Sequence, residues 1–487
     1  MAEYKLTVGL EVHAELKTLT KMFCACRNNP DEKTPNLNIC PVCMAHPGTL
    51  PVINKEAVHK VLLMGTALGG TLADYTEFDR KNYFYPDIPK GYQISQYKYP
   101  LVSGGSLRGV ELTRIHLEED TARSQHVGET SLVDYNRAGV PLMELVTEPV
   151  IHDAKTAGDF ARELQLLLRY LGAGEANMEK GEMRVEANIS VAPVRSASEI
   201  NQKESPEILG TKVEVKNINS FRSVERAIAF EAARQSKLLD EGGEVIQETR
   251  GWDETKQETF SQRKKESSHD YRYFPDPDLP KLKISEIPEF SAEQLKKELP
   301  ELPWQKRERY LGLGLKVEDA EMFIRQSYFG DFFDKVAALL KEQKLAHLAA
   351  NYIANDIASE ATEKEGPVIR VRNLLDSGIV EKFTKLIRMN GGGEISSRTT
   401  KDVLSRVVYG GEDPEEIVKK EGLAQQNNSG ALEEVVKKII EAYPQVVADY
   451  KAGKSTALQF LIGQGMKETK GAGNPTVLRE VFTKLLQ

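Results

Sequence analysis

The segment Leu6-Thr-Val-Gly-Leu-Glu-Val-His-Ala-Glu15 decides the fold class of the N-terminal part of this chain. Its apolar residues recur at every second position, which is the period of a β-strand with one buried face. Glu11 and His13 share the other parity and therefore face the same way. Taken alone, the segment fits a half-exposed strand with a solvated polar face better than it fits a functional site.

Short β-rich runs separated by glycine and proline turns continue to about residue 290, for example over 106–120 and 211–221. Leucines at helical spacing predict a helix from Asp153 to Leu171, and a second helix is expected from about Ser223 to Leu239. This mixture indicates an α+β fold with much antiparallel sheet.

The composition and the hydrophobic pattern of the sequence change after Asp276-Pro-Asp-Leu-Pro280 and Pro288. From there Ala, Leu, Lys and Glu dominate and predict an all-helical domain. Glycines at 391–393 and 410–411 then lead into a small, charged, helical tail. We therefore predict a catalytic cradle at 1–290, a helical domain at 291–408 and a tail domain at 409–487.

The composition is that of a folded protein, with 40% hydrophobic and 28% charged residues among 487. Its net charge of −8 means that contact with nucleic acid would depend on local basic patches. The N-terminus lacks the apolar core of a secretory signal, and no apolar run is long enough to span a membrane. We expect a cytoplasmic protein without membrane contact.

Two acidic segments are candidates for binding a hard cation. Glu118, Glu119 and Asp120 end an apparent strand that begins near Arg114, and Glu144 and Glu148 lie in a second segment. Mg²⁺ prefers oxygen ligands and usually takes one or two carboxylates together with water and phosphate. The alternative is a set of surface carboxylates paired with neighbouring cations, namely Arg114, Arg123 and Arg137.

Aromatic, amide and cationic residues are dense over 78–96. Such a stretch can stack an adenine or another base, and Arg80, Lys81 or Lys90 would suit a phosphate. On composition alone, a proline-ordered loop packed by its own tyrosines is about as good an interpretation.

The four cysteines, Cys24, Cys26, Cys40 and Cys43, form a C-x-C pair and a C-x₂-C pair. Four thiolates at this spacing predict a structural zinc site, although the first pair is tighter than usual. Four free thiols are the alternative, which is less favoured because exposed reactive thiols are generally avoided.

The tail contains a relaxed phosphate-loop pattern at 448–455, which we reject because no buried strand is expected before it. The tail lysines Lys454, Lys467 and Lys470 are instead candidates for binding an RNA backbone. A solvated helical face without a ligand is the simpler alternative. The chain has no G-x-S-x-G nucleophile elbow, so glutamine hydrolysis is not expected here.

A series of motifs, in one order along the chain, resembles the GatB family, which supplies one of the subunits of the tRNA-dependent amidotransferases. The motifs occupy residues 8–13, 78–87, 114–120, 187–190, 216–221 and 270–275, and the tail motifs 463–467 and 469–475 extend the resemblance to the C-terminal end. Glu186 stands where the family usually has an aspartate, and Gly465 replaces a bulkier residue.

The resemblance implies the reaction. ATP would phosphorylate the side-chain carboxylate of Glu-tRNA(Gln) or Asp-tRNA(Asn), and ammonia would then displace phosphate to give the amide. A separate amidase (GatA-type) partner would supply the ammonia, and a small third (GatC-type) partner would complete a heterotrimer. The tail would contact the misacylated tRNA.

The resemblance also implies the site. Glu11, His13, Glu119 and Glu144 match family positions around a catalytic Mg²⁺, and Glu118 is a further candidate ligand. A histidine is unusual for Mg²⁺, so Mn²⁺ is an alternative ion. We expect ATP or substrate contacts from Arg80, Lys81, Tyr83, Lys90, Ser95 and Gln96, and Zn²⁺ at the four cysteines.

Two other functions remain open at this point. A noncatalytic platform would bind tRNA and merely position a partner enzyme. A free-standing carboxylate ligase would act without an amidase partner.

Overall fold

The computed structural model describes residues 3–194, 209–264, 271–359, 374–425, 429–469 and 473–486. Contacts within the chain group it into two compact units, Met1–Pro303 and Trp304–Gln487, which we describe separately. The three-part division predicted from the sequence, with boundaries after residues 290 and 408, stays a prediction.

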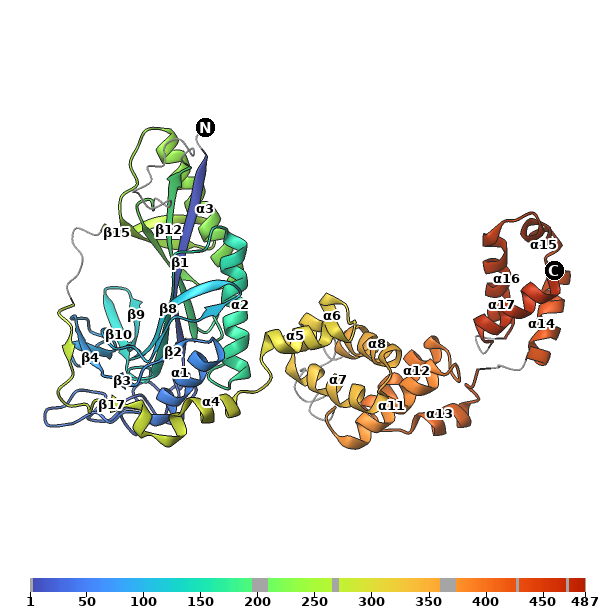
Figure 1. Ribbon diagram of the computed structural model, residues 1–487, viewed down its shortest axis with the longest axis horizontal. Helices are drawn as coiled ribbons and strands as arrows, with labels where there is room; N and C mark the ends of the chain where they lie inside the picture. Colours follow the sequence, from blue (N-terminus) through green and yellow to red (C-terminus); the bar gives the residue numbers. More distant parts are fainter. Residues whose placement is uncertain are drawn as a thin grey trace. The chain divides into compact units, whose positions relative to one another are not determined.

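The first unit is built on a ten-stranded sheet (Figure 1). β1 lies at its middle between β12 and β11, and every pair of neighbours is antiparallel except β13 and β14. In spatial order the strands are β15 (Glu258–Lys264), β14 (Glu248–Asp253), β13 (Val213–Ile218), β12 (Met183–Pro193), β1 (Tyr4–Glu15), β11 (Pro141–Thr147), β8 (Val110–Glu119), β6 (Val102–Ser103) and β2 (Thr71–Leu72), with β7 (Ser106–Leu107) beside β8.

The predicted alternation in the first strand is confirmed, because Val8, Leu10 and Val12 of β1 are completely buried. Both predicted helices are also present, as α2 (Ala154–Tyr170) and α3 (Phe221–Asp240). Asp153 and Ser220 cap them by accepting hydrogen bonds from backbone amides in the first turn. α3 packs against β12 and α2, so the helices hold the centre of the sheet in place.

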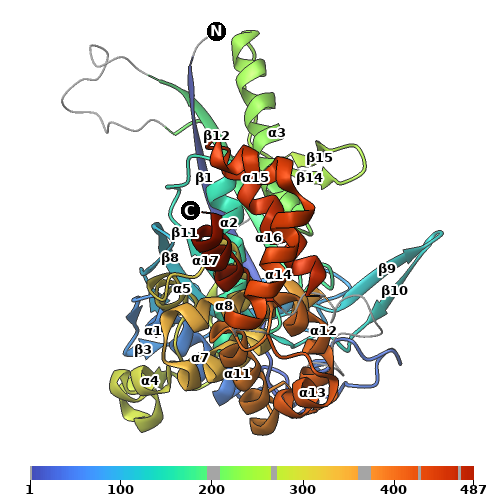
Figure 2. The same cartoon turned by 90° about the vertical axis from the view of Figure 1, so that its right-hand side faces the viewer.

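A smaller three-stranded sheet joins segments that are far apart in the sequence. It consists of β16 (Phe274–Pro275), β4 (Asp79–Asn82) and β5 (Tyr92–Ser95), and β5 contacts β8 of the large sheet. The remaining strands are two pairs, β3 (Tyr75–Thr76) with β17 (Leu282–Lys283) and the exposed hairpin β9 (Arg123–Val127) with β10 (Thr130–Asp134) (Figure 2). Two helices, α1 (Lys55–Ala67) and α4 (Ala292–Glu298), contact each other, and the short helical turns η1 (Ile284–Glu286) and η2 (Pro288–Phe290) precede α4.

The described part of the second unit is helical throughout, as predicted. Its aromatic core includes Tyr310, Phe323 and Phe333, whose rings contact one another. The first group of elements is α5 (Pro303–Gly312), α6 (Val317–Arg325), α7 (Ser327–Leu340), α8 (Gln343–Tyr352), η3 (Ile353–Ile357), α11 (Ser377–Gly391), α12 (Ser397–Val408) and α13 (Pro414–Glu421).

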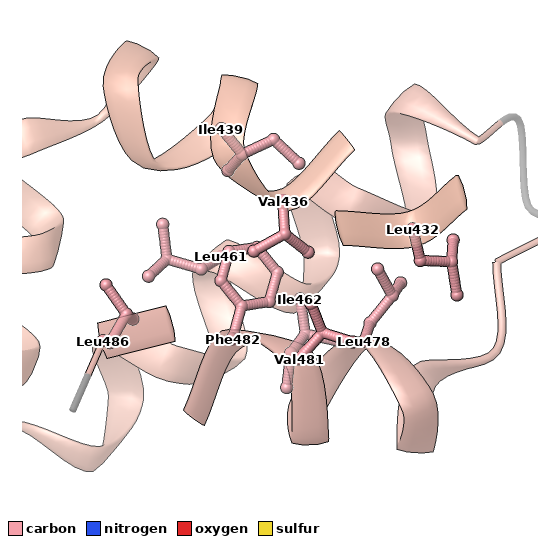
Figure 3. Packing of buried hydrophobic residues seen from close by; sticks show 9 residues of the cluster. All are labelled: Leu432, Val436, Ile439, Leu461, Ile462, Leu478, Val481, Phe482 and Leu486. Atoms are coloured by element: carbon pink, nitrogen blue, oxygen red, sulfur yellow. The ribbon is translucent and has the colours of Figure 1, made fainter. Parts of the chain in front are cut away.

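The last four helices surround a separate apolar cluster (Figure 3). They are α14 (Ser429–Ala442), α15 (Pro444–Lys451), α16 (Ser455–Glu468) and α17 (Pro475–Leu486). Leu432, Leu461, Leu478 and Phe482 are completely buried in the cluster, so these helices stabilise one another through a core of their own.

The rejection of a phosphate loop at 448–455 agrees with this fold, because a helix rather than a strand precedes the turn between α15 and α16. Across the described ranges, none of the helices combines the length and the apolar character that crossing a membrane requires.

Candidate active site

A row of polar side chains crosses the centre of the large sheet. His13 on β1 lies opposite Glu144 on β11, and Glu144 lies opposite His116 on β8. Directly opposed residues of antiparallel strands project from the same face, so the three side chains meet there. Glu11 and Glu118 share that face, since each is two residues along its strand from a member of the row.

The carboxylate of Glu144 is the hub of this group. Its Oε2 atom lies 3.4 Å from His13 Nε2 and 3.3 Å from His116 Nε2. His13 Nε2 is also 3.6 Å from Glu11 Oε1 and 3.7 Å from Glu118 Oε1. Two overlapping sets, Glu11–His13–Glu144 and His116–Glu118–Glu144, therefore each place their ligand atoms within 4.8 Å of one another, close enough to hold a metal ion.

This face is largely covered, and Glu11, with 28% of its side chain exposed, keeps the most contact with solvent. The side chain of His13 is 14% exposed, and that of Glu118 only 3%. Ser95 Oγ at the end of β5 donates a 3.2 Å hydrogen bond to Glu118. The strand pattern could not reveal this, because the covering residues come from distant segments of the chain.

Burial and mutual charge shift the titration of the group. Burial, followed by the charge of Glu144, raises the pKa of Glu11 to about 7. Burial alone would lower the pKa of His13, but the hydrogen bond with Glu144 and the surrounding carboxylates outweigh it and raise that pKa to about 9. Burial opposes ionisation of Glu144, yet the two histidines hold its pKa well below the usual range. The row thus concentrates negative charge that a cation would stabilise.

Lys81 brings a positive charge to the same group from β4. Burial would lower its pKa, but the negative charges of Glu118 and other nearby acidic groups raise it overall. Its ammonium also lies 5.0 Å from the centre of the Tyr271 ring and 5.9 Å from that of Tyr83. A fixed cation of this kind suits a phosphate or carboxylate brought to the site.

Glu119 is not brought together with the other predicted ligands. It follows Glu118 in the strand and faces the opposite way, where it pairs with Lys90 and accepts a 2.9 Å hydrogen bond from the Ile94 amide. Glu119, Lys90 and Tyr92 instead line a cavity of about 200 Å³ that also contacts the cysteine cluster.

The remaining predicted contact residues are partly engaged within the protein. Arg80 forms ion pairs with Asp276 at 2.9 Å and Asp278 at 2.8 Å. The Tyr83 hydroxyl donates to the Gln93 side chain, and the side-chain oxygen of Gln96 accepts a hydrogen bond from the Leu117 backbone amide. The ion pairs tie β4 to the residues that follow β16, and the Gln96 contact joins the end of the small sheet to β8, so that together they position Lys81 and Ser95.

The four cysteines converge as predicted. All four sulfur atoms lie within 4.8 Å of one another, and Cys26 Sγ is 4.0 Å from Cys43 Sγ. Tetrahedral Zn²⁺ with Zn–S bonds of about 2.3 Å separates its ligands by about 3.8 Å, so the cluster fits that ion. Lys21 is fully buried with its Nζ atom 4.0 Å from Cys43 Sγ, which places a cation beside the cluster.

Sequence reasoning missed several residues that border this site. His116 lies in the row itself, and its parity with Glu118 in one strand was a usable signal. Arg184 stands opposite His13 and forms a 2.9 Å ion pair with Asp120. Lys216 likewise pairs with Glu186 at 2.8 Å. These pairs depend on strand register, which no local pattern disclosed.

The tail lysines lie on the surface. Lys454 forms a 3.2 Å ion pair with Asp449, and its side chain remains 63% exposed. Lys467 is also exposed, near the end of α16. Lys470 lies outside the described residues.

Comparison with known proteins identifies the family. A family model described as the GatB/GatE catalytic domain matches residues 6–288, and one described as the GatB domain matches residues 331–486. The chain belongs to the GatB family. The resemblance to this family that the sequence motifs indicated is thereby confirmed. The match over residues 6–288 includes every residue of the polar row.

Relatives in this family match the chain from end to end. The GatB-type subunit of the aspartyl/glutamyl-tRNA(Asn/Gln) amidotransferase of Crocosphaera subtropica is 40% identical to this chain. The match covers 99% of this chain and 98% of that relative. The protein of the same name from Carboxydothermus hydrogenoformans is 41% identical with the same two coverages. That from Dehalococcoides mccartyi is 40% identical, with both chains covered completely. These relatives support an amidotransferase role within a complex of several subunits.

Proposed function

We propose that this chain phosphorylates and then amidates the side-chain carboxylate of Glu-tRNA(Gln), Asp-tRNA(Asn) or both. The observation that carries the proposal is the buried row of His13, Glu144 and His116, flanked by Glu11 and Glu118 and faced by Lys81. The names of the full-length relatives supply the tRNA substrate class.

In the first step, a carboxylate oxygen of the aminoacyl group attacks the γ-phosphorus of ATP, and ADP leaves. Both reactants are anions, so they repel each other unless cations stand between them. Bound Mg²⁺ or Mn²⁺ would neutralise the phosphates and orient the reacting oxygens. Glu11, His13, Glu118 and Glu144 would hold the ion, and Lys81 would contact the phosphate or the carboxylate.

In the second step, ammonia attacks the carbonyl carbon of the acyl phosphate, phosphate leaves, and one proton is released to give the amide. The low exposure of Glu118 and Glu144 would limit the access of bulk water, which would otherwise hydrolyse the acyl phosphate. We propose that a GatA-type amidase partner supplies the ammonia and that a small GatC-type partner joins the complex.

Other parts of the chain would support the reaction. Zn²⁺ at the four cysteines would stiffen the loop beside Glu119 and Lys90. Lys454 and Lys467 of the tail would contact the tRNA backbone. Because Glu119 lies apart from the row, we propose that Glu118 binds the ion in its place, together with Glu11, His13 and Glu144. We assign Glu119 to the neighbouring cavity.

The test uses the complex reconstituted with its amidase partner. Glu11→Gln and Glu118→Gln should each abolish most ATP-dependent amide formation on Glu-tRNA while leaving tRNA binding intact. Glu111→Gln offers a matched control, because Glu111 is an exposed carboxylate on the same strand as Glu118. Full activity in both site variants would favour the noncatalytic platform instead. Activity of the isolated chain with glutamine as the only nitrogen source would show that no amidase partner is needed.

A further inference from the structure

Four tyrosines form a continuous aromatic array beside the polar row, which we call the tyrosine platform. The rings of Tyr97 and Tyr273 are stacked, with centroids 4.4 Å apart and planes 10° from parallel. Tyr273 meets Tyr271 edge-on at 6.0 Å, and Tyr271 meets Tyr83 at 5.8 Å. The four rings come from two segments that are far apart in the sequence.

Hydrogen bonds and ion pairs from β4 fix the backbone that carries Tyr271 and Tyr273. Asn82 Nδ2 donates a 2.8 Å hydrogen bond to the Arg272 carbonyl, and the Asn82 amide donates to the Tyr271 carbonyl at 3.0 Å. These bonds support a left-handed backbone at Arg272, where φ is +45°. Arg80 fixes the following residues through its ion pairs with Asp276 and Asp278. Rings positioned in this way lose little freedom when a ligand stacks on them.

One end of the platform faces the polar row. The Lys81 ammonium lies over the Tyr271 and Tyr83 rings, and burial together with nearby negative charges raises the pKa of Tyr273 to about 12. The other end faces solvent, because Tyr97 is 60% exposed. The platform therefore runs from the candidate reaction centre to the surface.

We propose that the tyrosine platform binds the unpaired 3′ nucleotides of the aminoacyl-tRNA by base stacking. The inference rests on the proposed function, because the aminoacyl group at the 3′ end has to reach the polar row. Unpaired bases stack readily on aromatic side chains, whatever their sequence. Several linked rings suit consecutive bases, whereas one adenine of ATP needs a single ring within a concave pocket.

The test compares Tyr97→Ala with Tyr97→Phe in the reconstituted complex. Loss of a stacking ring should raise the KM for Glu-tRNA by on the order of fivefold to a hundredfold. The phenylalanine variant keeps the ring and should recover most of that loss. Tyr328→Ala removes a tyrosine that is 36% exposed on α7 of the second unit, and serves as the matched control.

A fluorescent adenine analogue at the 3′ terminus of the tRNA gives a direct second measurement. Its emission should be quenched on binding to the wild-type and Tyr97→Phe complexes, and much less with Tyr97→Ala. Unchanged KM and quenching in Tyr97→Ala would overturn the inference. So would an equal loss of ATP affinity, which would assign the ring to ATP, or failure of the complex to assemble, which would assign it to a protein interface. An inactive wild-type complex would instead count against the proposed function itself.

Discussion

Replacing Glu144 with glutamine tests the hub of the site at nearly constant volume. The carboxylate lies 3.3 Å from His116 and 3.4 Å from His13, and its side chain is 8% exposed. At an effective dielectric constant of about 20, a unit charge pair at this distance is worth about 5 kcal/mol before desolvation is counted. Breaking such a buried pair by removing one partner typically costs about 3–5 kcal/mol.

Glu144→Gln should therefore disturb both the electrostatics of the row and cation binding. We expect apparent affinity for Mg²⁺ or Mn²⁺ to fall by at least about tenfold to a hundredfold. Amide formation per folded complex should fall by about 10²–10³-fold, the scale for losing a preorganised electrostatic contact. The assay measures amidated tRNA while the divalent cation is titrated, with the fraction of folded protein determined in parallel.

Glu163→Gln is the control for this prediction. Glu163 is a buried carboxylate on α2 that pairs with Arg108 at 3.2 Å, away from the row. Its substitution should lower stability without changing the cation dependence of the reaction. If Glu144→Gln kept the wild-type cation dependence and turnover, or if Glu163→Gln matched its loss, the assignment of Glu144 would be refuted.

Three further changes test other parts of the chain. Cys43→Ser should lower bound zinc, measured by elemental analysis, well below the one ion per chain expected for the wild type; an unchanged zinc content would contradict the site. Phe482→Ala should cost about 3–5 kcal/mol in the last four helices, seen as faster amide hydrogen exchange there; unaltered exchange would argue against their shared core. Lys454→Glu combined with Lys467→Glu should weaken tRNA binding and reduce its salt dependence by roughly 0.7–0.9 in logarithmic slope per lost contact; an unaltered slope would leave the tail without a phosphate contact from these lysines.

Local patterns predicted the elements well. The alternation in Leu6–Glu15 predicted a strand, and the leucine spacing before Gly172 predicted a helix that ends within one residue of the expected position. These successes have a physical basis, because a buried face repeats with the period of its own backbone.

The same local patterns could not predict what covers a face. Glu118 and Glu119 are neighbours in one strand, yet the first joins the polar row and the second pairs with Lys90. Parity within β8 separates the two carboxylates, but strand register and the small sheet decide what each one meets. His116 shares its parity with Glu118, which local pattern could show, but its contact with Glu144 depends on the register between β8 and β11.

The family resemblance contributed what physical patterns could not. Strand parity led to Glu11 and His13 as a pair, and cysteine spacing led to a metal cluster. Neither observation specifies a tRNA or an ammonia donor. Those parts of the account depend on the full-length relatives and remain proposals for this chain.

The central claim is that the side-chain carboxylate is phosphorylated before ammonia attacks. Glu-tRNA carrying heavy oxygen in that carboxylate tests it most directly in the reconstituted complex. One labelled oxygen should leave with phosphate for each amide formed, because the acyl phosphate passes its bridging oxygen to the departing phosphate. Phosphate without the label, released alongside normal amide formation, would contradict the account.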